Sequence, residues 1–255
     1  MNRGANAASR RPRASRVATA LTMGVREYVR TPVLVVLLAV LPVYFIGVVG
    51  YVTPDVAVPI AVADRTVRVG MAEMYATLAA PLTGALVGGI AGLFVMQATR
   101  QADARLVLAG YRPTEVVTAR VGVLAGVCLA LTGVSLGVLS WTAAPDRLAW
   151  FGAATLLAAL TYALVGALVG TLLGRLAGVY AMLFAPTLDV FLFQNPTATD
   201  ASARAAWLPA HYAVAAAMDA AFGSGFDATP LLEGLGYLGI VAAIAAAAFY
   251  RSVKA

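Results

Sequence analysis

Charged residues are missing from five long stretches and one shorter stretch of this 255-residue chain. A helix that rises ~1.5 Å per residue needs roughly 20 apolar residues to cross about 30 Å of hydrocarbon. A soluble helical core of this size would interrupt its apolar faces with charges every few residues. We therefore predict an all-α, polytopic integral membrane protein with six transmembrane helices. The uncharged stretches are residues 31–54, 74–99, 121–145, 148–174, 176–188 and 234–250, the fifth continuing past Asp189 to Asn195.

Cysteine, histidine and lysine are almost absent, because Cys128, His211 and Lys254 are the only ones in the sequence. A single cysteine excludes an intrachain disulfide and a thiolate metal site. His211 has no second His or Cys at ligand spacing, so it indicates no metal site either. The Walker A loop of ATP-binding proteins needs a Lys directly after a glycine-rich turn, and Lys254 at the end of the chain does not meet this requirement. We predict no metal and no cofactor in this chain.

One pattern of a hydrolytic enzyme is present around Ser135, where Gly133-Val-Ser-Leu-Gly137 matches Gly-x-Ser-x-Gly. Serine hydrolases need this pattern on a sharp strand-to-helix turn, whereas here it falls in the middle of a predicted helix. The sole histidine lies in a different, outer segment. We therefore assign no catalytic residues and predict that the chain is not an enzyme.

The basic residues gather on one side of the predicted membrane. If the N-terminus is cytoplasmic and each stretch crosses once, 14 of the 18 Lys and Arg residues fall in cytoplasmic parts, and eight of the 12 Asp and Glu residues fall outside. This positive-inside asymmetry predicts a plasma-membrane protein with both termini in the cytoplasm. The net charge of +6 follows from that topology. Because the arginines are dispersed among loops, we exclude a nucleic-acid partner.

The chain divides into a disordered basic tail, residues 1–15, and one six-span domain, residues 16–255. A cytoplasmic loop is predicted at residues 100–120. The outer region, residues 196–230, mixes aromatic and small residues, which is typical of helices that lie in the outer membrane interface. The predicted spans are residues 33–53, 74–98, 121–144, 148–174, 176–194 and 233–250.

Residues 16–30, directly before the first span, have an amphipathic period of their own. Apolar residues fall on one face and arginines on the other, which predicts a helix lying in the cytoplasmic interface. A solvated start to the first span is the alternative. The residues that define the interfacial helix are Arg16, Leu21, Arg26, Tyr28 and Arg30.

The cytoplasmic loop is the most distinctive soluble segment. Residues 101–109 favour a short helix that Gly110 can end, and Pro113 can begin a second helix that runs into the third span. Leu106, Leu108 and Tyr111 are apolar although they lie in a cytoplasmic loop. They either dip into the lipid headgroups or dock on a protein partner.

Two features inside the spans are informative. Asp189 is the acid within an apolar stretch, and an intramembrane carboxylate is a functional candidate by default. It lies about 9 Å below the outer helix end by helix rise, so it either lines a cavity or is a wetted helix end. Glycines also recur at four-residue spacing, as in Gly84, Gly88 and Gly92. This spacing predicts close helix packing, mostly within one subunit.

Three segments carry a family resemblance. Val25-Arg-Glu-Tyr-Val-Arg-Thr-Pro32, Arg105-Leu-Val-Leu-Ala-Gly-Tyr-Arg-Pro-Thr-Glu115 and Leu208-Pro-Ala-His-Tyr212 occur in this order around the predicted spans. They resemble the connecting helix, the coupling loop and the outer "Leu-Pro" stretch of type-2, export-class ABC transporter permeases. The resemblance covers nearly the whole chain. The chain departs from larger members of the family in its small outer region between the first two spans.

The resemblance implies a permease subunit that lines a substrate path together with a second permease subunit. ATP and Mg would be bound by a separate ATPase subunit, and membrane lipid would surround the spans. A small six-span secondary carrier, a substrate-capture subunit of an importer and an intramembrane enzyme remain the alternatives. The implied ATPase-coupling residues are Leu106, Leu108, Tyr111, Arg112 and Glu115, and the path residues are Asp189 and Pro186.

Overall fold

The computed structural model describes residues 32–54, 56–62, 65–108, 113–141, 145–197, 205–225 and 227–254. This part of the chain is mostly helical, and five of its helices are long and apolar enough to cross a membrane. The predicted tail, residues 1–15, and the predicted interfacial helix, residues 16–30, lie outside the described residues. The five helices are Met71–Gln97, Arg120–Leu139, Leu148–Leu172, Arg175–Phe193 and Thr229–Ala248.

Each of these five helices corresponds to one of the predicted spans. The helix of the third predicted span, residues 121–144, ends earlier than predicted, at Leu139. The first predicted span, residues 33–53, contains a shorter apolar helix, Leu38–Val52. The apolar helices are those of a membrane protein, and the sixth crossing stays a prediction. The elements in chain order are α3 Pro32–Pro42, η1 Val43–Val48, α4 Val49–Val52, β1 Ala57–Val62, β2 Arg65–Gly70, α5 Met71–Leu108, α6 Pro113–Leu139, α7 Leu148–Leu172, α8 Arg175–Leu188, η2 Asp189–Phe193, η3 Ala205–Trp207, α9 His211–Phe222 and α10 Thr229–Lys254.

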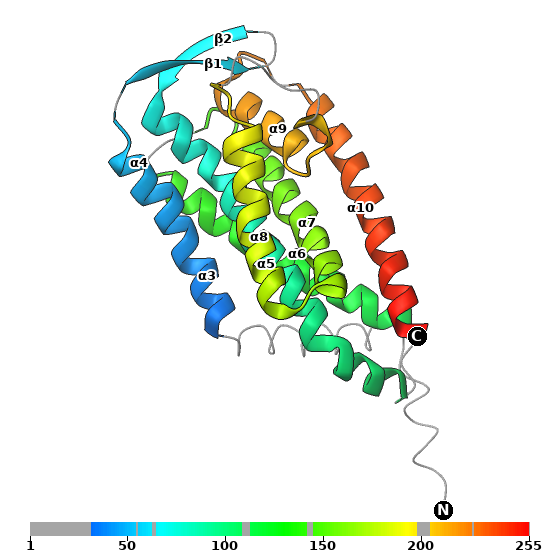
Figure 1. Cartoon of the computed structure of the whole chain (residues 1–255). Helices are drawn as coiled ribbons and strands as arrows, with labels where there is room; N and C mark the ends of the chain where they lie inside the picture. The colour runs from blue at the N-terminus through cyan, green and yellow to red at the C-terminus, as the bar shows by residue number, and fades with distance from the viewer. Residues whose placement is uncertain are drawn as a thin grey trace, which may run out of the picture.

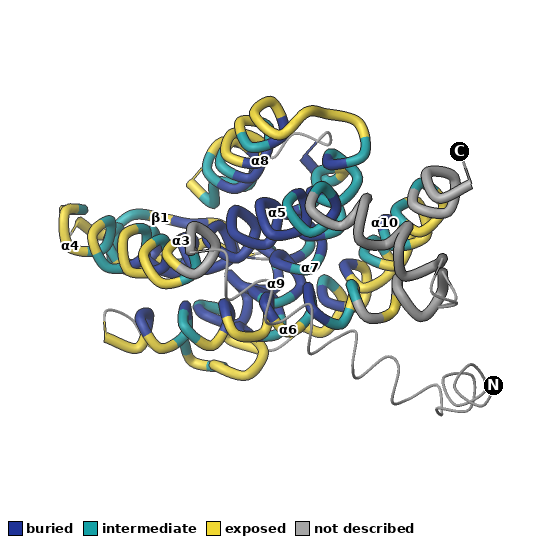
Figure 2. Tube along the Cα trace, turned by 90° about the horizontal axis from the view of Figure 1, so that it is seen from below, coloured by how far each residue is buried: buried dark blue, intermediate teal, exposed yellow. Residues whose placement is uncertain are grey.

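Helices α5 and α7 form the buried centre of the bundle, and the other spans surround them (Figure 2). The two backbones approach closely because glycines face the partner helix. A Cβ atom at Gly88 or Gly92 of α5 would collide with a carbonyl oxygen of α7, and one at Gly166 of α7 would collide with Gly89. The glycine spacing thus produces an intrachain contact, as small residues do where lipid offers no hydrophobic drive.

A β-hairpin caps one end of the bundle, so the all-α prediction is wrong in this detail (Figure 1). Strands β1 and β2 pair antiparallel in a register that places Ala57 opposite Gly70. The buried side chains of Ile60 and Val62 pack with Met74 in the first turn of α5. The hairpin forms because β-branched residues alternate along both strands and bury one face on the bundle.

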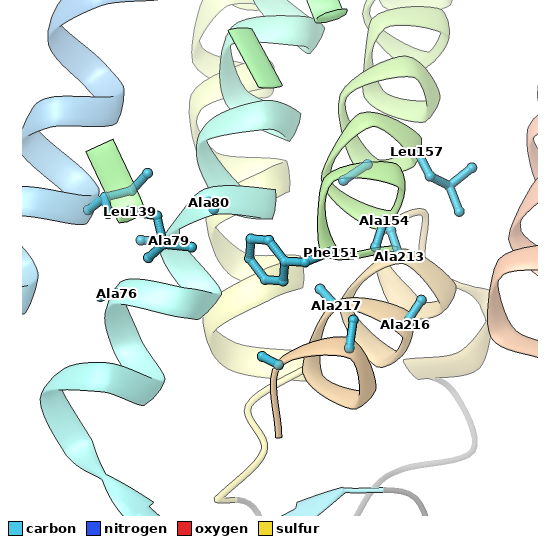
Figure 3. Packing of buried hydrophobic residues seen from close by; sticks show 14 of the residues in the cluster. Ala76, Ala79, Ala80, Leu139, Phe151, Ala154, Leu157, Ala213, Ala216 and Ala217 are labelled. Carbon is cyan, nitrogen blue, oxygen red and sulfur yellow. The ribbon is translucent and has the colours of Figure 1, made fainter. Parts of the chain in front are cut away.

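Helix α9 lies beneath the hairpin and is buried within the bundle, whereas we predicted helices of the outer region to lie in the membrane interface. Its alanines pack around Phe151 and Ala154 of α7 (Figure 3). Arg147, just before α7, donates its backbone N–H to the carbonyl of Ala220 and its guanidinium to that of Gly223. These bonds satisfy carbonyls at the end of α9, where helices favour a positive charge.

The three most exposed aromatic side chains of the described residues lie at the same end of the molecule. Tyr51 at the end of α4, Trp141 after α6 and Trp207 in η3 are 91%, 81% and 82% exposed. Trp and Tyr gather at the boundary between hydrocarbon and water, since their rings are apolar with one polar group. These side chains are therefore of the kind that a membrane interface accommodates.

Candidate functional site

The predicted cytoplasmic loop is largely helical. Helix α5 does not stop where its apolar span ends at Gln97 but continues without interruption to Leu108. No glycine or proline occurs between these two residues, so nothing in the sequence ends the helix earlier. Helix α6 begins at Pro113, a favoured first position because proline lacks an N–H to be satisfied. The helix predicted at residues 101–109 is therefore the end of α5 and no separate element.

None of the five residues of the implied coupling contact has a described side chain. Tyr111 and Arg112 lie outside the described residues. Leu106, Leu108 and Glu115 lie in α5 and α6, where the backbone alone is described. Their role stays a prediction. Arg16, Leu21, Arg26, Tyr28 and Arg30 of the interfacial helix also lie outside the described residues.

Asp189 lies at the end of α8, and its carboxyl group is the centre of a buried hydrogen-bond network. The residue is 3% exposed. The hydroxyl of Tyr162 on α7 donates to Oδ2 at 2.6 Å, and the backbone N–H of Ala210 donates to the same oxygen at 2.8 Å. The side-chain amide of Gln194 donates to Oδ1 at 3.2 Å. Asp189 is therefore no wetted helix end, because protein donors take the place of water.

These bonds tie three parts of the chain together. Tyr162 belongs to α7, and Ala210 is the residue directly before α9. A buried carboxyl group without partners would cost several kcal/mol, so each donor is needed for its burial. The network fixes the start of α9 against α7 and α8. Within one chain its role is structural, and a role in a path between two copies stays a prediction.

The backbone at Asp189 is a π-turn. Asp189–Phe193 forms η2, and the N–H of Gln194 bonds to the carbonyl of Asp189, five residues back. The buried Pro186 precedes the turn by three residues, and proline cannot donate the regular helical bond. Such turns occur often at functional sites, since the inserted residue re-aims neighbouring side chains. Here the turn brings Gln194 back toward the carboxyl group of its own first residue.

Gln194 links the network to His211, the first residue of α9. Its amide nitrogen donates to Asp189 and to the carbonyl of Ala205 at 3.0 Å, so its oxygen accepts from Nδ1 of His211 at 2.9 Å. The network thus assigns the proton of a neutral imidazole to Nδ1. Burial lowers the pKa of His211, against the opposing effect of the Asp189 and Glu233 charges. The imidazole is therefore neutral at pH 7.

Sequence reasoning singled out Asp189 as a candidate but did not find the residues that bond to its carboxyl group. Asp189 lies fourteen residues above the start of α8, or ~21 Å, and Tyr162 lies ten residues above the end of α7, or ~15 Å. A tyrosine side chain spans much of that difference. Matching polar groups by depth on antiparallel spans would have found this pair. Gln194 and His211 gave no such signal, because both lie in the segment between two spans.

Ser135, the centre of the Gly-x-Ser-x-Gly pattern, is fully buried within α6. Among the described residues its hydroxyl has no hydrogen-bond partner. A nucleophilic serine needs a base within hydrogen-bond reach. The geometry therefore gives Ser135 no activation within the described part of the chain.

The fold is that of a helical membrane protein with a buried hydrogen-bond network at the hairpin end. We call this network, formed by Asp189, Tyr162, Gln194, Ala210 and His211, the polar lock. Comparison of the chain with protein-family models, curated proteins and solved structures found no match.

Proposed function

We propose that this chain is the transmembrane permease subunit of a type-2 ABC exporter, and that a separate subunit binds and hydrolyses ATP. Two copies of the chain, or one copy and a close relative, would form the substrate path in the plasma membrane. The proposal rests on the resemblance of three sequence segments and on five apolar helices of spanning length.

The observation that carries the proposal is the length of α5. Its 38 residues correspond to about 57 Å of helix, whereas the hydrocarbon core is about 30 Å thick. The part that follows the apolar span, residues 98–108, adds ~16 Å beyond Gln97. Helix α5 is also the centre of the bundle and contacts α6, α7, α8 and α9. A force on the end of α5 would reach the whole bundle through this one helix.

The membrane orientation belongs to the same proposal. The ends of α5 and α10 lie at one end of the bundle, and the hairpin and α9 lie at the other (Figure 1). We assign the end with α5 to the cytoplasm, in agreement with the positive-inside rule. The consecutive elements α3, η1 and α4 would form the first of six crossings, with both termini in the cytoplasm.

In this proposal the ATPase binds the end of α5 and the start of α6. Its contacts would be Leu106, Leu108, Tyr111, Arg112 and Glu115, and closure of the ATPase would push on α5. The rigid spans would convert that push into opening on the hairpin side, along a path near Asp189 and Pro186. This is a coupling free energy between two sites that share packed elements.

The test is the Leu108→Asp variant, expressed with the partner ATPase, a Walker A protein that we expect the neighbouring reading frame to encode. A carboxylate buried at the contact costs several kcal/mol, so the ATPase should no longer co-purify although the permease still inserts. Ser224→Asp is the matched control, because it adds a carboxylate at the exposed opposite end, beside Arg65. Full co-purification and transport with Leu108→Asp would remove this segment from the interface.

A further inference from the structure

A cavity of about 330 Å³ lies beside the central helix α7, between α5, α6 and α10. It faces the ends of α5 and α10, away from the hairpin: its lining on α7 runs from Leu160 to Thr171, and on α10 from Leu238 to Ala246. By helix rise the α7 lining is ~16 Å long. Pockets that bind small molecules begin at about 300 Å³, so the cavity is large enough for an elongated ligand.

Small side chains create this space. Ala163 and Ala167 of α7 and Ala242 and Ala245 of α10 are among the residues that line it. Helices α6 and α10 flank α7 with little direct contact between them in the described part of the chain (Figure 2). A lipid chain from the surrounding bilayer would enter the cavity between these two helices.

The lining is apolar except at one end. There Arg120, which begins the apolar span of α6, and Thr171 line the cavity. The Thr171 hydroxyl donates to the carbonyl of Leu168 at 2.7 Å, and Arg120 is the charged residue of the lining. A polar solute would leave its groups unsatisfied along the walls. An apolar chain with an anionic group at one end matches both parts of the lining.

We propose that this cavity binds one acyl chain of an anionic membrane phospholipid, with the lipid phosphate at Arg120. A guanidinium presents several N–H donors in a plane and suits phosphate oxygens. Basic groups between transmembrane helices near a membrane surface are typical positions for anionic headgroups. The site is separate from the ATPase contact and does not depend on the proposed transport function.

The experiment uses the full chain, purified without any ATPase from nanodiscs of phosphatidylglycerol and phosphatidylcholine in equal amounts. The lipid retained by the protein after transfer to detergent is identified by native mass spectrometry. The wild-type protein should retain one phosphatidylglycerol. Arg120→Gln should still retain one lipid but should no longer prefer phosphatidylglycerol over phosphatidylcholine. The ratio of bound phosphatidylglycerol to bound phosphatidylcholine should fall roughly tenfold from that of the wild-type protein.

Ala242→Phe fills the cavity and should abolish retention of both lipids. Ala243→Phe is the matched control, because its side chain is exposed on the outer face of the same helix. Thermal unfolding of both variants reports whether the helix remains packed. Full retention by Ala242→Phe, or equal loss in Ala243→Phe, would overturn the location. A wild-type protein that retains the two lipids equally would overturn the headgroup assignment. Failure of ATPase binding would leave each of these results unchanged.

Discussion

A single methyl group added at Gly92 should destabilise the bundle, whereas the same change at Gly133 should stabilise it. Gly92 of α5 lies against the backbone of α7, and its Cβ would collide with the carbonyl of Ala163. Gly133 of α6 has no heavy atom within 4 Å of the added Cβ. Both residues lie within long apolar helices, so the two substitutions differ chiefly in what the methyl group contacts.

The magnitudes follow from two opposing effects. Alanine gains about 0.5–1 kcal/mol over glycine within a helix, because it loses less backbone entropy on folding. Overpacking a tight contact costs about 1–3 kcal/mol, and a collision with backbone falls at the upper end, since no side chain can rotate away. Gly92→Ala should therefore lose about 2 kcal/mol net, and Gly133→Ala should gain about 0.5–1 kcal/mol.

Thermal unfolding in one detergent, followed by size exclusion, measures both variants under matched conditions. The midpoint of Gly92→Ala should fall below that of the wild-type protein, and the midpoint of Gly133→Ala should equal or exceed it. Gly166→Ala tests the same contact from α7, because its Cβ would collide with Gly89. Equal midpoints for Gly92→Ala and Gly133→Ala would refute the close approach of α5 and α7.

Two further predictions concern the polar lock. Asp189→Asn keeps the shape of the side chain but turns one hydrogen-bond acceptor into a donor, so the protein should lose about 1–3 kcal/mol of stability. Asp227→Asn in the exposed loop is the control and should change stability little. An unchanged unfolding midpoint together with reduced export would instead assign Asp189 to the substrate path. Because burial lowers the pKa of His211, the unfolded state binds more protons below pH 6.5. Stability should therefore fall as the pH drops from 8 to 5, and His211→Asn should flatten this dependence; a pH profile that the substitution leaves unchanged would contradict the assignment.

The spans could be predicted because charge is the strongest signal in a membrane sequence. An ionised side chain in hydrocarbon is so unfavourable that its absence over about 20 residues identifies a spanning helix. The helices Met71–Gln97 and Leu148–Leu172 coincide closely with gaps in the charge pattern. The gaps do not say which helix is central, because apolar residues face lipid and protein alike. The charge pattern therefore could not predict that α5 and α7 are the buried helices.

The hairpin left a signal in the sequence that the apolar pattern obscured. Val58, Ile60 and Val62 alternate with other residues, as do Val67 and Val69. This period of two predicts strands. Pro59 counts against a strand, since it lacks an N–H, yet proline is tolerated where a strand has a free edge. Attention to alternation in the short segment between two spans would have predicted the hairpin.

Helix α9 shows why composition alone misplaces a segment. Ala213, Ala217 and Ala220 recur at helical spacing and are buried, yet alanine has too little apolar surface to indicate burial by itself. The aromatic residues nearby favoured the membrane interface instead. The position of α9 depends on Arg147 and on the Asp189 network, and both are contacts between residues far apart in sequence. Such contacts depend on the tertiary fold and could not be read from local patterns.

Side-chain contacts hold both ends of the bundle. At the hairpin end, Asp189 and Arg147 join α7, α8 and α9 by hydrogen bonds. At the other end, the side-chain amide of Gln97 donates to the carbonyl of Leu173, and the guanidinium of Arg175 lies over the ring of Phe94. Packed elements move as units. In the proposed mechanism, a push on residues 98–108 would therefore reach the hairpin end through α5 and the helices packed on it. The cavity beside α7 lies along that route, so a lipid bound there would sit between the proposed coupling segment and the Asp189 network.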